Sequence, residues 1–215
     1  FIIGIVSLIL FLLSLEETMN GWALLMAILS FTMFYFYENR HHEPFISIET
    51  LKKNPTVSWV YIQFTIICLI YYCYFFGLPT FLQQVKHYSA HHTGLIMLAL
   101  AGFSVVVAPF VGRMVDRHGS KQAMLVGAVL MLIGTGLLLT YDQTSSLISL
   151  IIMMAILGMS TGFNNLSTQT ALYEHVSQAD TGSASGLFQT SRYVGSILSA
   201  SVLGLTFNRQ LDLES

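Results

Sequence analysis

Long apolar stretches alternate with short polar ones along this chain, and four of the apolar stretches contain no Asp, Glu, Lys or Arg. These four charge-free stretches are residues 54–85, 87–112, 122–141 and 143–173. An ionised side chain at the centre of a bilayer is costly, and about 20 helical residues cross a hydrocarbon layer of roughly 30 Å. The pattern therefore predicts membrane-spanning helices. The strands of an outer-membrane barrel would instead appear as short segments of alternating hydrophobicity.

Reading the pattern to both ends of the chain gives seven predicted spans. They are residues 1–15, 19–37, 57–82, 93–111, 123–141, 146–170 and 182–206. Composition agrees, since 54% of the residues are hydrophobic and 9% are charged, whereas a soluble domain has roughly a quarter of its residues charged. A single cleaved signal peptide does not explain repeated runs. We predict an all-α, multi-pass membrane protein with about seven transmembrane helices.

Basic residues orient these spans, because Lys and Arg accumulate in loops on the cytoplasmic side. One set of alternate loops holds Arg40, Lys52, Lys53, Arg113, Arg117 and Lys121, and the opposite set holds Lys86 and Arg209. The loops at 38–56, 112–122 and 171–181 are therefore predicted to be cytoplasmic. The chain begins on Phe1, inside an apolar run, and we expect both of its ends to be cuts in a longer protein.

The ten residues GRMVDRHGSK, 112–121, concentrate charge between two apolar spans. A short basic loop is by itself explained as a retention signal for the cytoplasmic side. This one is more particular, because Gly112 and Gly119 flank the charges and permit tight turns or close helix approach. On a helical end, Arg113, Asp116 and Arg117 fall close enough to pair with each other or with a neighbouring helix terminus.

This segment resembles the signature loop of the major facilitator superfamily. The matching positions are Gly112, Asp116, Arg117, Gly119 and Lys121. Two longer stretches, FGLPTFLQQVKHYSAHHTGLIMLALAGFSVVVAPFVGRMVDRHG (76–119) and GSASGLFQTSRYVGSILSASVLG (182–204), are similar to its 14-helix drug:proton antiporter branch. The resemblance implies a partial major facilitator fold. Residues 1–37 would be the extra helix pair between the two halves, 38–56 a cytoplasmic linker, and 57–215 an incomplete C-terminal six-helix bundle with five helices present.

The resemblance also implies a function, namely proton-coupled efflux of lipophilic or cationic drugs by alternating access, with Gly112–Lys121 as a cytoplasmic gating latch. Its expected setting is the plasma membrane of a bacterial cell, and its expected partners are the lipid bilayer, a small-molecule substrate, protons and a missing N-terminal half of the same chain. No Asp or Glu occurs within the seven spans. The proton carriers are therefore expected outside this sequence, or protons are not the coupling ion. An exporter of a specific metabolite and a seven-helix receptor or sensor are the alternatives.

Polar residues inside the predicted spans are the candidates for a substrate cavity. Arg192 shares a helical stripe with Ser185, Gln189 and Ser196, and such a face lines protein or water in preference to lipid. Arg192 would then organise a network or attract an anion, unless it makes a static bond to backbone carbonyls or reaches the membrane surface. The span 146–170 adds Asn164, Asn165 and Gln169, which either hold helices together or bind substrate, and Gly158 and Gly162 there suit close helix packing.

Aromatic residues crowd the span 57–82, where Tyr71 and Tyr74 are suited to stacking on flat or cationic compounds, although interface belts also collect Tyr. His87, His91 and His92 lie together without a nearby carboxylate or Cys, so we predict no metal site. Cys68 and Cys73 lie inside one span and are interpreted as packing residues. No Ser/His/Asp arrangement is present at one membrane depth. We expect no catalytic activity, no cofactor and no nucleic-acid partner.

Overall fold

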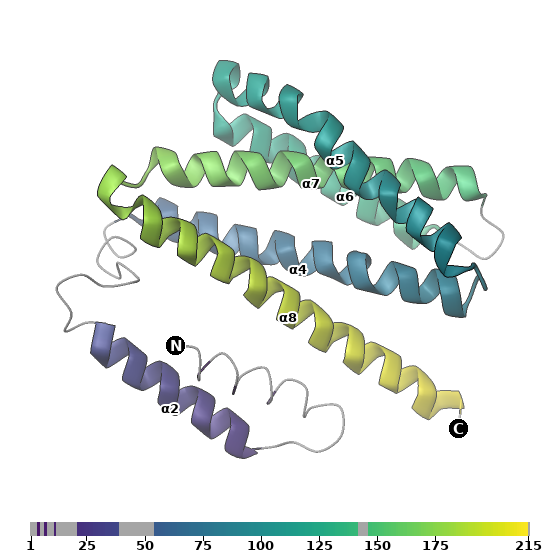
Figure 1. The fold of residues 1–215 in the computed structure, drawn as a ribbon, viewed down its shortest axis with the longest axis horizontal. Helices are drawn as coiled ribbons and strands as arrows, with labels where there is room; N and C mark the ends of the chain where they lie inside the picture. The colour runs from purple at the N-terminus through teal and green to yellow at the C-terminus, as the bar shows by residue number, and fades with distance from the viewer. Residues whose placement is uncertain are drawn as a thin grey trace.

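The computed structural model describes residues 21–38, 54–141 and 146–214, with Gly4, Ser7 and Phe11 as isolated positions. Within these residues the chain is helical and has no strand (Figure 1). The helices are α2 (Gly21–Glu38), α4 (Pro55–Gln84), α5 (Ala90–His118), α6 (Ser120–Leu139), α7 (Leu147–Glu174), the short 3-10 helix η1 (Gln178–Asp180) and α8 (Thr181–Glu214).

Helices occur at six of the seven predicted spans, and the first span, 1–15, lies almost entirely outside the described residues. Most of the predicted linker, 38–56, lies outside them too. Within the described part of the chain, α4, α5, α6 and α7 are long and apolar enough to cross a membrane. Helices α2 and α8 are not among these four. Helix α8 has the length but is rich in Ser, Thr and Gly and carries Arg192, and it packs closely on α4.

Local sequence explains where several helices begin. Helix α4 starts at Pro55, whose fixed φ suits the first turn and whose missing N–H is not needed there. Helices α5 and α7 follow Ser89 and Ser146, whose hydroxyls accept hydrogen bonds from the backbone N–H groups of His92 and Ile148, both at 3.3 Å. Such caps satisfy donors that an α-helix leaves unpaired at its first turn.

The segment predicted as the loop 112–122 is helical. Helix α5 continues to His118 and α6 begins at Ser120, so Gly119 alone interrupts the two helices. A helix of 29 residues is about 43 Å long, more than the hydrocarbon thickness of roughly 30 Å. The charged end of α5 therefore extends beyond the apolar layer and remains helical there. The charge-free run, which ends at residue 112, does not indicate this extension of the helix.

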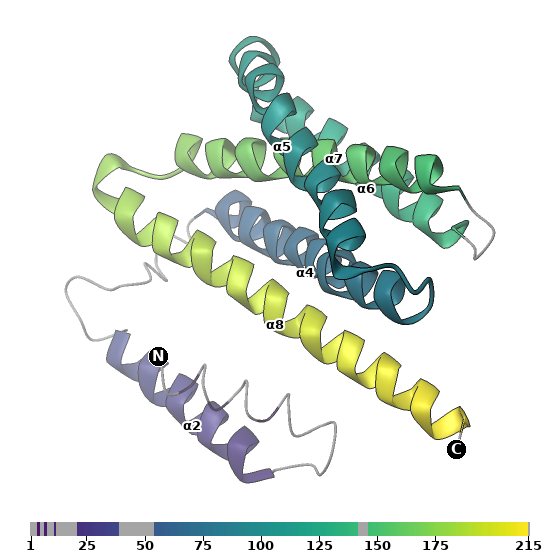
Figure 2. The same ribbon diagram turned by 45° about the vertical axis from the view of Figure 1, so that its right-hand side comes forward.

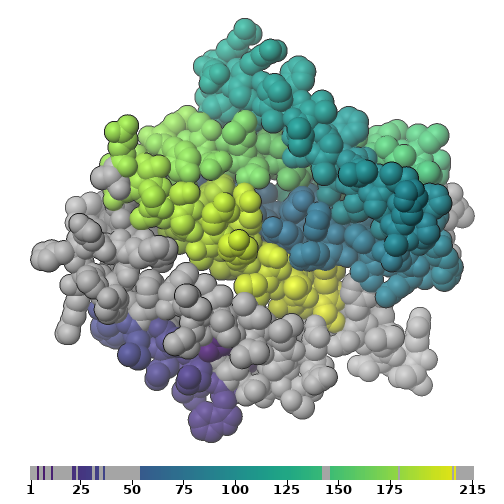
Figure 3. All heavy atoms as spheres, in the orientation of Figure 1, coloured from purple at the N-terminus to yellow at the C-terminus, as the bar shows by residue number. Residues whose placement is uncertain are grey.

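Two groups of helices make up the described bundle. Helices α5 and α6 both pack extensively on α7, and α8 packs extensively on α4, while contacts between the two groups are fewer. Both ribbon views show α4 and α8 on one side of α7, while α5 crosses α7 and reaches the end of α4 (Figures 1 and 2). In the space-filling view, α4 is visible between α8 and α5 (Figure 3).

Glycines let these helices approach closely. A Cβ at Gly158 would collide with the backbone carbonyl of Leu100, and a Cβ at Gly162 would lie 2.8 Å from the carbonyl oxygen of Ser104. The close packing predicted at these two glycines is thereby confirmed, with α5 as the partner helix. A third contact joins α8 to α4, where a Cβ at Gly195 would lie 2.6 Å from the Cβ of Cys68.

Helix α2 lies apart from this bundle in both ribbon views (Figures 1 and 2). Within the described residues it has no close backbone contact with α4 to α8. Many of its apolar side chains are exposed, among them Trp22, Ile28 and Met33. Exposed apolar side chains on a helix of this kind are compatible with lipid as their surroundings.

Candidate functional site

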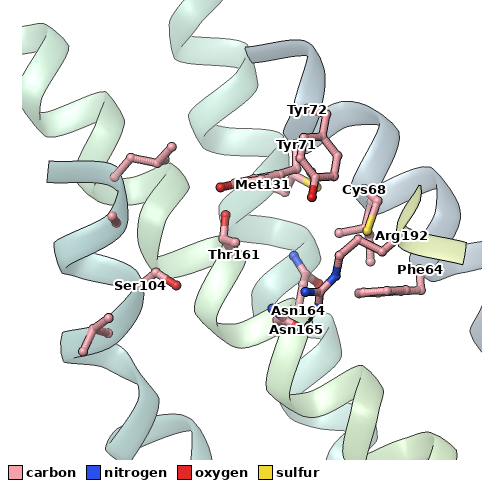
Figure 4. Close-up of a pocket in the computed structure, with 14 residues that line it drawn as sticks. Phe64, Cys68, Tyr71, Tyr72, Ser104, Met131, Thr161, Asn164, Asn165 and Arg192 are labelled. Carbon is pink, nitrogen blue, oxygen red and sulfur yellow. Dashed lines mark hydrogen bonds between the residues drawn. The ribbon is translucent and has the colours of Figure 1, made fainter. Parts of the chain in front are cut away.

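A cavity of about 350 Å³ lies where α4 and α8 face α5, α6 and α7 (Figure 4). Its polar, aromatic and sulfur-containing lining residues are Phe64, Cys68, Tyr71 and Tyr72 of α4, Ser104 of α5, Met131 of α6, Thr161, Asn164 and Asn165 of α7, and Arg192 of α8. All five helices of the bundle thus contribute to one site. Its position follows from the packing, because it lies where the two helix groups meet and are least closely packed.

Arg192 reaches this cavity from the N-terminal half of α8. Its guanidinium donates a hydrogen bond from Nη2 to Oδ1 of Asn165, at 3.0 Å, and lies over the ring of Phe64 with 5.8 Å from Cζ to the ring centroid. The ring of Phe64 is itself stacked on Phe188 of α8, with centroids 3.8 Å apart. Arg192 is therefore held by a side-chain amide and an aromatic face, and it points into the bundle.

A chain of hydrogen bonds from Asn164 through Ser160 joins α7 to α6 at the wall of the cavity. Its Nδ2 donates to Oγ of Ser160 at 3.2 Å, and the Ser160 hydroxyl donates to the backbone carbonyl of Gly127 in α6 at 2.9 Å. Asn164 is 1% exposed, and its Oδ1 has no hydrogen-bond partner among the described residues. Hydrogen bonds of this kind hold helices together in lipid, so Asn164 combines a helix contact with a place in the cavity wall.

The two tyrosine candidates occupy different places. Tyr71 lines the cavity, and its ring stacks on Phe75 with centroids 5.4 Å apart. Tyr74 is buried in the apolar core beside the cavity, and its hydroxyl forms a 3.2 Å hydrogen bond with Oγ1 of Thr161. Tyr74 thus does not line the cavity itself, but it contacts Thr161, which does.

The remaining candidates lie outside the cavity. Gln169 donates a hydrogen bond from Nε2 to the hydroxyl of Tyr173, at 3.3 Å. Gln189 is exposed, and Ser185 and Ser196 are half-buried without lining the cavity. Of the polar stripe proposed for α8, Arg192 is thus the member that the structure brings to the cavity.

The charged segment 112–121 lies at the ends of α5 and α6. Arg113, Asp116 and Arg117 are exposed, and among the described residues no ion pair joins them. The pairing within the motif that helical spacing suggested is not formed here. A different hydrogen bond is present at the start of α6. The buried Ser120 donates from its hydroxyl to a carboxylate oxygen of Glu174, at 2.7 Å. That contact fixes the start of α6 to the end of α7.

Comparison with known proteins decides the family. Residues 1–200 match the family model described as Major Facilitator Superfamily. The chain belongs to the major facilitator superfamily. It is 36% identical to the uncharacterized MFS-type transporter YwoD of Bacillus subtilis (strain 168), over 97% of this chain and 46% of that protein.

Two further relatives carry names of multidrug transporters. The multidrug transporter protein MdtP of Bacillus subtilis (strain 168) is 27% identical over 96% of this chain and 39% of its own length. The multidrug resistance protein Stp of Mycobacterium tuberculosis (strain H37Rv) is 26% identical over 80% of this chain and 32% of its own length. The chain thus spans less than half the length of these curated relatives. No solved structure matches it.

Membership confirms several expectations. The resemblance to the superfamily and to its multidrug transporters is confirmed, as is the partial, all-helical membrane fold. The protein is an integral, multi-pass membrane protein of a transporter family, which supports a role other than that of an enzyme. Its bacterial relatives suggest a plasma membrane.

Sequence reasoning did not select six of the polar, aromatic and sulfur-containing residues that line the cavity. They are Phe64, Cys68, Tyr72, Ser104, Met131 and Thr161. A usable signal existed for α4, because Phe64, Cys68 and Tyr71 are spaced four and three apart and so share one helical face. No comparable signal marks Ser104 or Met131, since each is one small polar or flexible apolar residue in an apolar run.

Proposed function

We propose that this chain is part of an exporter that moves lipophilic, drug-like compounds across a bacterial plasma membrane by alternating access, driven by proton influx. Family membership supports transport, and several relatives are named for multidrug resistance or efflux. Because the chain spans less than half of those relatives, the activity belongs to the complete protein.

The cavity between the two helix groups is the observation that carries this proposal. Aromatic rings of Phe64, Tyr71 and Tyr72 supply flat apolar surface, and two asparagines and Arg192 supply a few polar groups. Sites for drug-sized molecules commonly have this make-up, with an apolar lining and few convergent polar groups. In many transporters the substrate site lies near the bilayer midplane between groups of helices that rock against each other.

The charge of the cavity restricts the range of exported compounds, which were expected from the sequence to be lipophilic or cationic. Among the residues that line it, Arg192 is the only one with a full charge, and that charge is positive. A positive lining charge disfavours cations through Coulomb repulsion, most strongly where the local dielectric constant is low. Lipophilic compounds without a positive charge are therefore the expected cargo. Export of a defined polar metabolite is the second candidate, because Asn164, Asn165 and Arg192 provide directional hydrogen bonding.

Proton coupling in this proposal depends on groups outside the membrane parts of the described helices. Within α4 to α7, the acids are Asp116 and Glu174, and both lie at helix ends.

We also propose that 1–37 is the extra helix pair, 38–56 a cytoplasmic linker and 57–215 five helices of the C-terminal bundle. In this arrangement the loops at 38–56, 112–122 and 171–181 face the cytoplasm.

Efflux from cells tests the proposed function. The complete reading frame is expressed in bacteria that lack their major efflux pumps, and the cells are loaded with the neutral lipophilic dye Nile red. Energised cells should lose the dye faster than vector controls, and a protonophore should abolish the difference. Loss at the vector rate would contradict the proposal. Uptake of a panel of amino acids and sugars into everted vesicles under a pH gradient tests the metabolite alternative.

The gating role of the segment 112–121 has its own test. Asp116→Asn removes a charge without changing the size of the side chain, and Asp116→Glu keeps the charge as the matched control. If the segment is a latch, the Asn variant changes the balance of inward-open and outward-open states, measured by distances between spin labels, and slows efflux severalfold. Unchanged populations and unchanged efflux in the Asn variant would eliminate the latch.

A further inference from the structure

The cavity contains a positive charge without a negative partner in its wall. Of its lining residues, Arg192 alone is ionised, and no Asp or Glu is among them. The hydrogen bond to Asn165 uses one N–H of a guanidinium that has five. Asn165 is a neutral amide, so it orients the guanidinium, and among the described residues it leaves the positive charge without a negative partner.

An uncompensated positive charge at this place favours the binding of an anion. Charged side chains within membrane proteins usually pair with an opposite charge or face a water-filled cavity, because ions are costly in a low-dielectric medium. An anion entering the cavity would supply the missing negative charge. It would also meet the planar donor fork of Arg192, which matches a carboxylate with two parallel hydrogen bonds.

Aromatic surface surrounds this charge. The ring of Phe64 lies against the guanidinium, and Tyr71 and Tyr72 line the cavity on the same helix (Figure 4). Rings in such positions stack on flat ligands. The volume of about 350 Å³ lies within the range of small-molecule sites.

From these contacts we infer that the cavity binds aromatic compounds that carry an acidic group, with the anion paired to Arg192 and the ring system against Phe64, Tyr71 and Tyr72. The inference rests on the proposed export function and specifies its cargo as aromatic acids in preference to organic cations. Asn165 is a positioning residue in this site, because it fixes the guanidinium that contacts the anion.

Two dyes with one ring system provide the test. Fluorescein and rhodamine 123 share a xanthene ring, and at pH 7.5 the first is an anion and the second a cation. Binding of each to the purified complete protein is measured by fluorescence anisotropy. The variants are Arg192→Gln, which removes the charge, and Arg192→Lys, which keeps the charge and loses the planar fork. Lys86→Gln removes one positive charge outside the cavity and is the matched control.

We expect the unmodified protein to bind fluorescein more tightly than rhodamine 123. Arg192→Gln should weaken fluorescein binding roughly ten- to hundredfold, the scale of hydrogen bonds to a charged group, and should leave rhodamine 123 binding unchanged or stronger. Arg192→Lys should be intermediate, and Lys86→Gln should match the unmodified protein.

Rhodamine 123 binding at least as tightly as fluorescein to the unmodified protein would overturn the inference. So would an equal loss of both dyes in Arg192→Gln and Arg192→Lys, which would show a purely structural role for Arg192. Nile red efflux separates these results from the proposed function. Nile red efflux without a preference for fluorescein would support the export function and contradict the inference. An Arg192-dependent preference for fluorescein without Nile red efflux would support the inference and contradict the export function.

Discussion

Gly119 is the single residue between α5 and α6, and its backbone has φ of 83° and ψ of 161°. This region of backbone space is essentially restricted to glycine. Gly119→Ala should cost about 1–3 kcal/mol through backbone strain alone, because a Cβ there would meet no atom within 4 Å. Thermal melting of the solubilised protein measures the loss. Gly102→Ala, in α5 with equally open space, is the control and should melt no lower than the unmodified protein. Equal melting of the two variants would contradict the strain argument.

Single residues also show how far the sequence predicts the candidate site. The position of Arg192 in an apolar span indicated a protein-facing side chain, and the structure places it in the cavity. Gln189 lies on the same stripe and is exposed, although it is less than one turn from Arg192, and α8 runs obliquely to α4 (Figures 1 and 2). Helical spacing fixes which residues share a face, but the neighbour of that face depends on the crossing of the helices.

At the scale of elements, the contact of α5 with α7 depends on Gly158. A Cβ at this position would collide with the backbone of Leu100, and a backbone cannot rotate away as a side chain can. Gly158→Ala should therefore destabilise the protein by about 1–3 kcal/mol or more, as overpacking does in other cores. Gly136→Ala in α6, where a Cβ meets no atom within 4 Å, is the matched control. Melting temperatures of the two variants provide the measurement, and a Gly158→Ala protein as stable as the control would refute this packing.

The bond between Ser120 and Glu174 joins the start of α6 to the end of α7. Ser120→Ala should cost about 1–3 kcal/mol, because it removes the hydroxyl that donates to a charged acceptor. Glu174→Gln keeps an acceptor oxygen and should cost less. Chemical denaturation of the solubilised protein compares the two. A larger loss of unfolding free energy in Glu174→Gln than in Ser120→Ala would show that the Glu174 carboxylate stabilises the protein through a contact other than Ser120.

Element boundaries were largely predictable because lipid imposes length and polarity on each helix. Ser89 and Ser146 explain why α5 and α7 begin where they do. The helical state of 112–118 was not predictable from hydropathy, since charge marks the end of the apolar layer and not the end of the helix. The cap at Gly119 ends α5, and the sequence offered two glycines, Gly112 and Gly119, without indicating which of them takes that backbone conformation.

On the scale of the whole molecule, the cavity results from unequal packing between helix groups. Helices α5 and α6 pack on α7, α8 packs on α4, and the space that remains between the groups is lined by all five. Hydrophobic periodicity could not predict this grouping, because in lipid every helix face is apolar enough to meet a neighbour. Small residues were the better guide, since Gly158 and Gly162 marked a close contact correctly and left only its partner unknown.

Two native cysteines on α4 report on this cavity in the complete protein. Cys68 lines it, whereas Cys73 does not, and both are free thiols. If exported compounds occupy the cavity, Nile red at ten times its Kd should slow N-ethylmaleimide modification of Cys68 about tenfold, because a bound site excludes the reagent. Cys73 should react at its original rate, which mass spectrometry of the two thiols measures in one sample. Equal protection of both cysteines would indicate a change of the whole helix, and no protection of Cys68 would place the cargo elsewhere. The comparison of the two thiols separates protection within the cavity from a change of the whole helix, so it tests the cavity as the place where cargo binds.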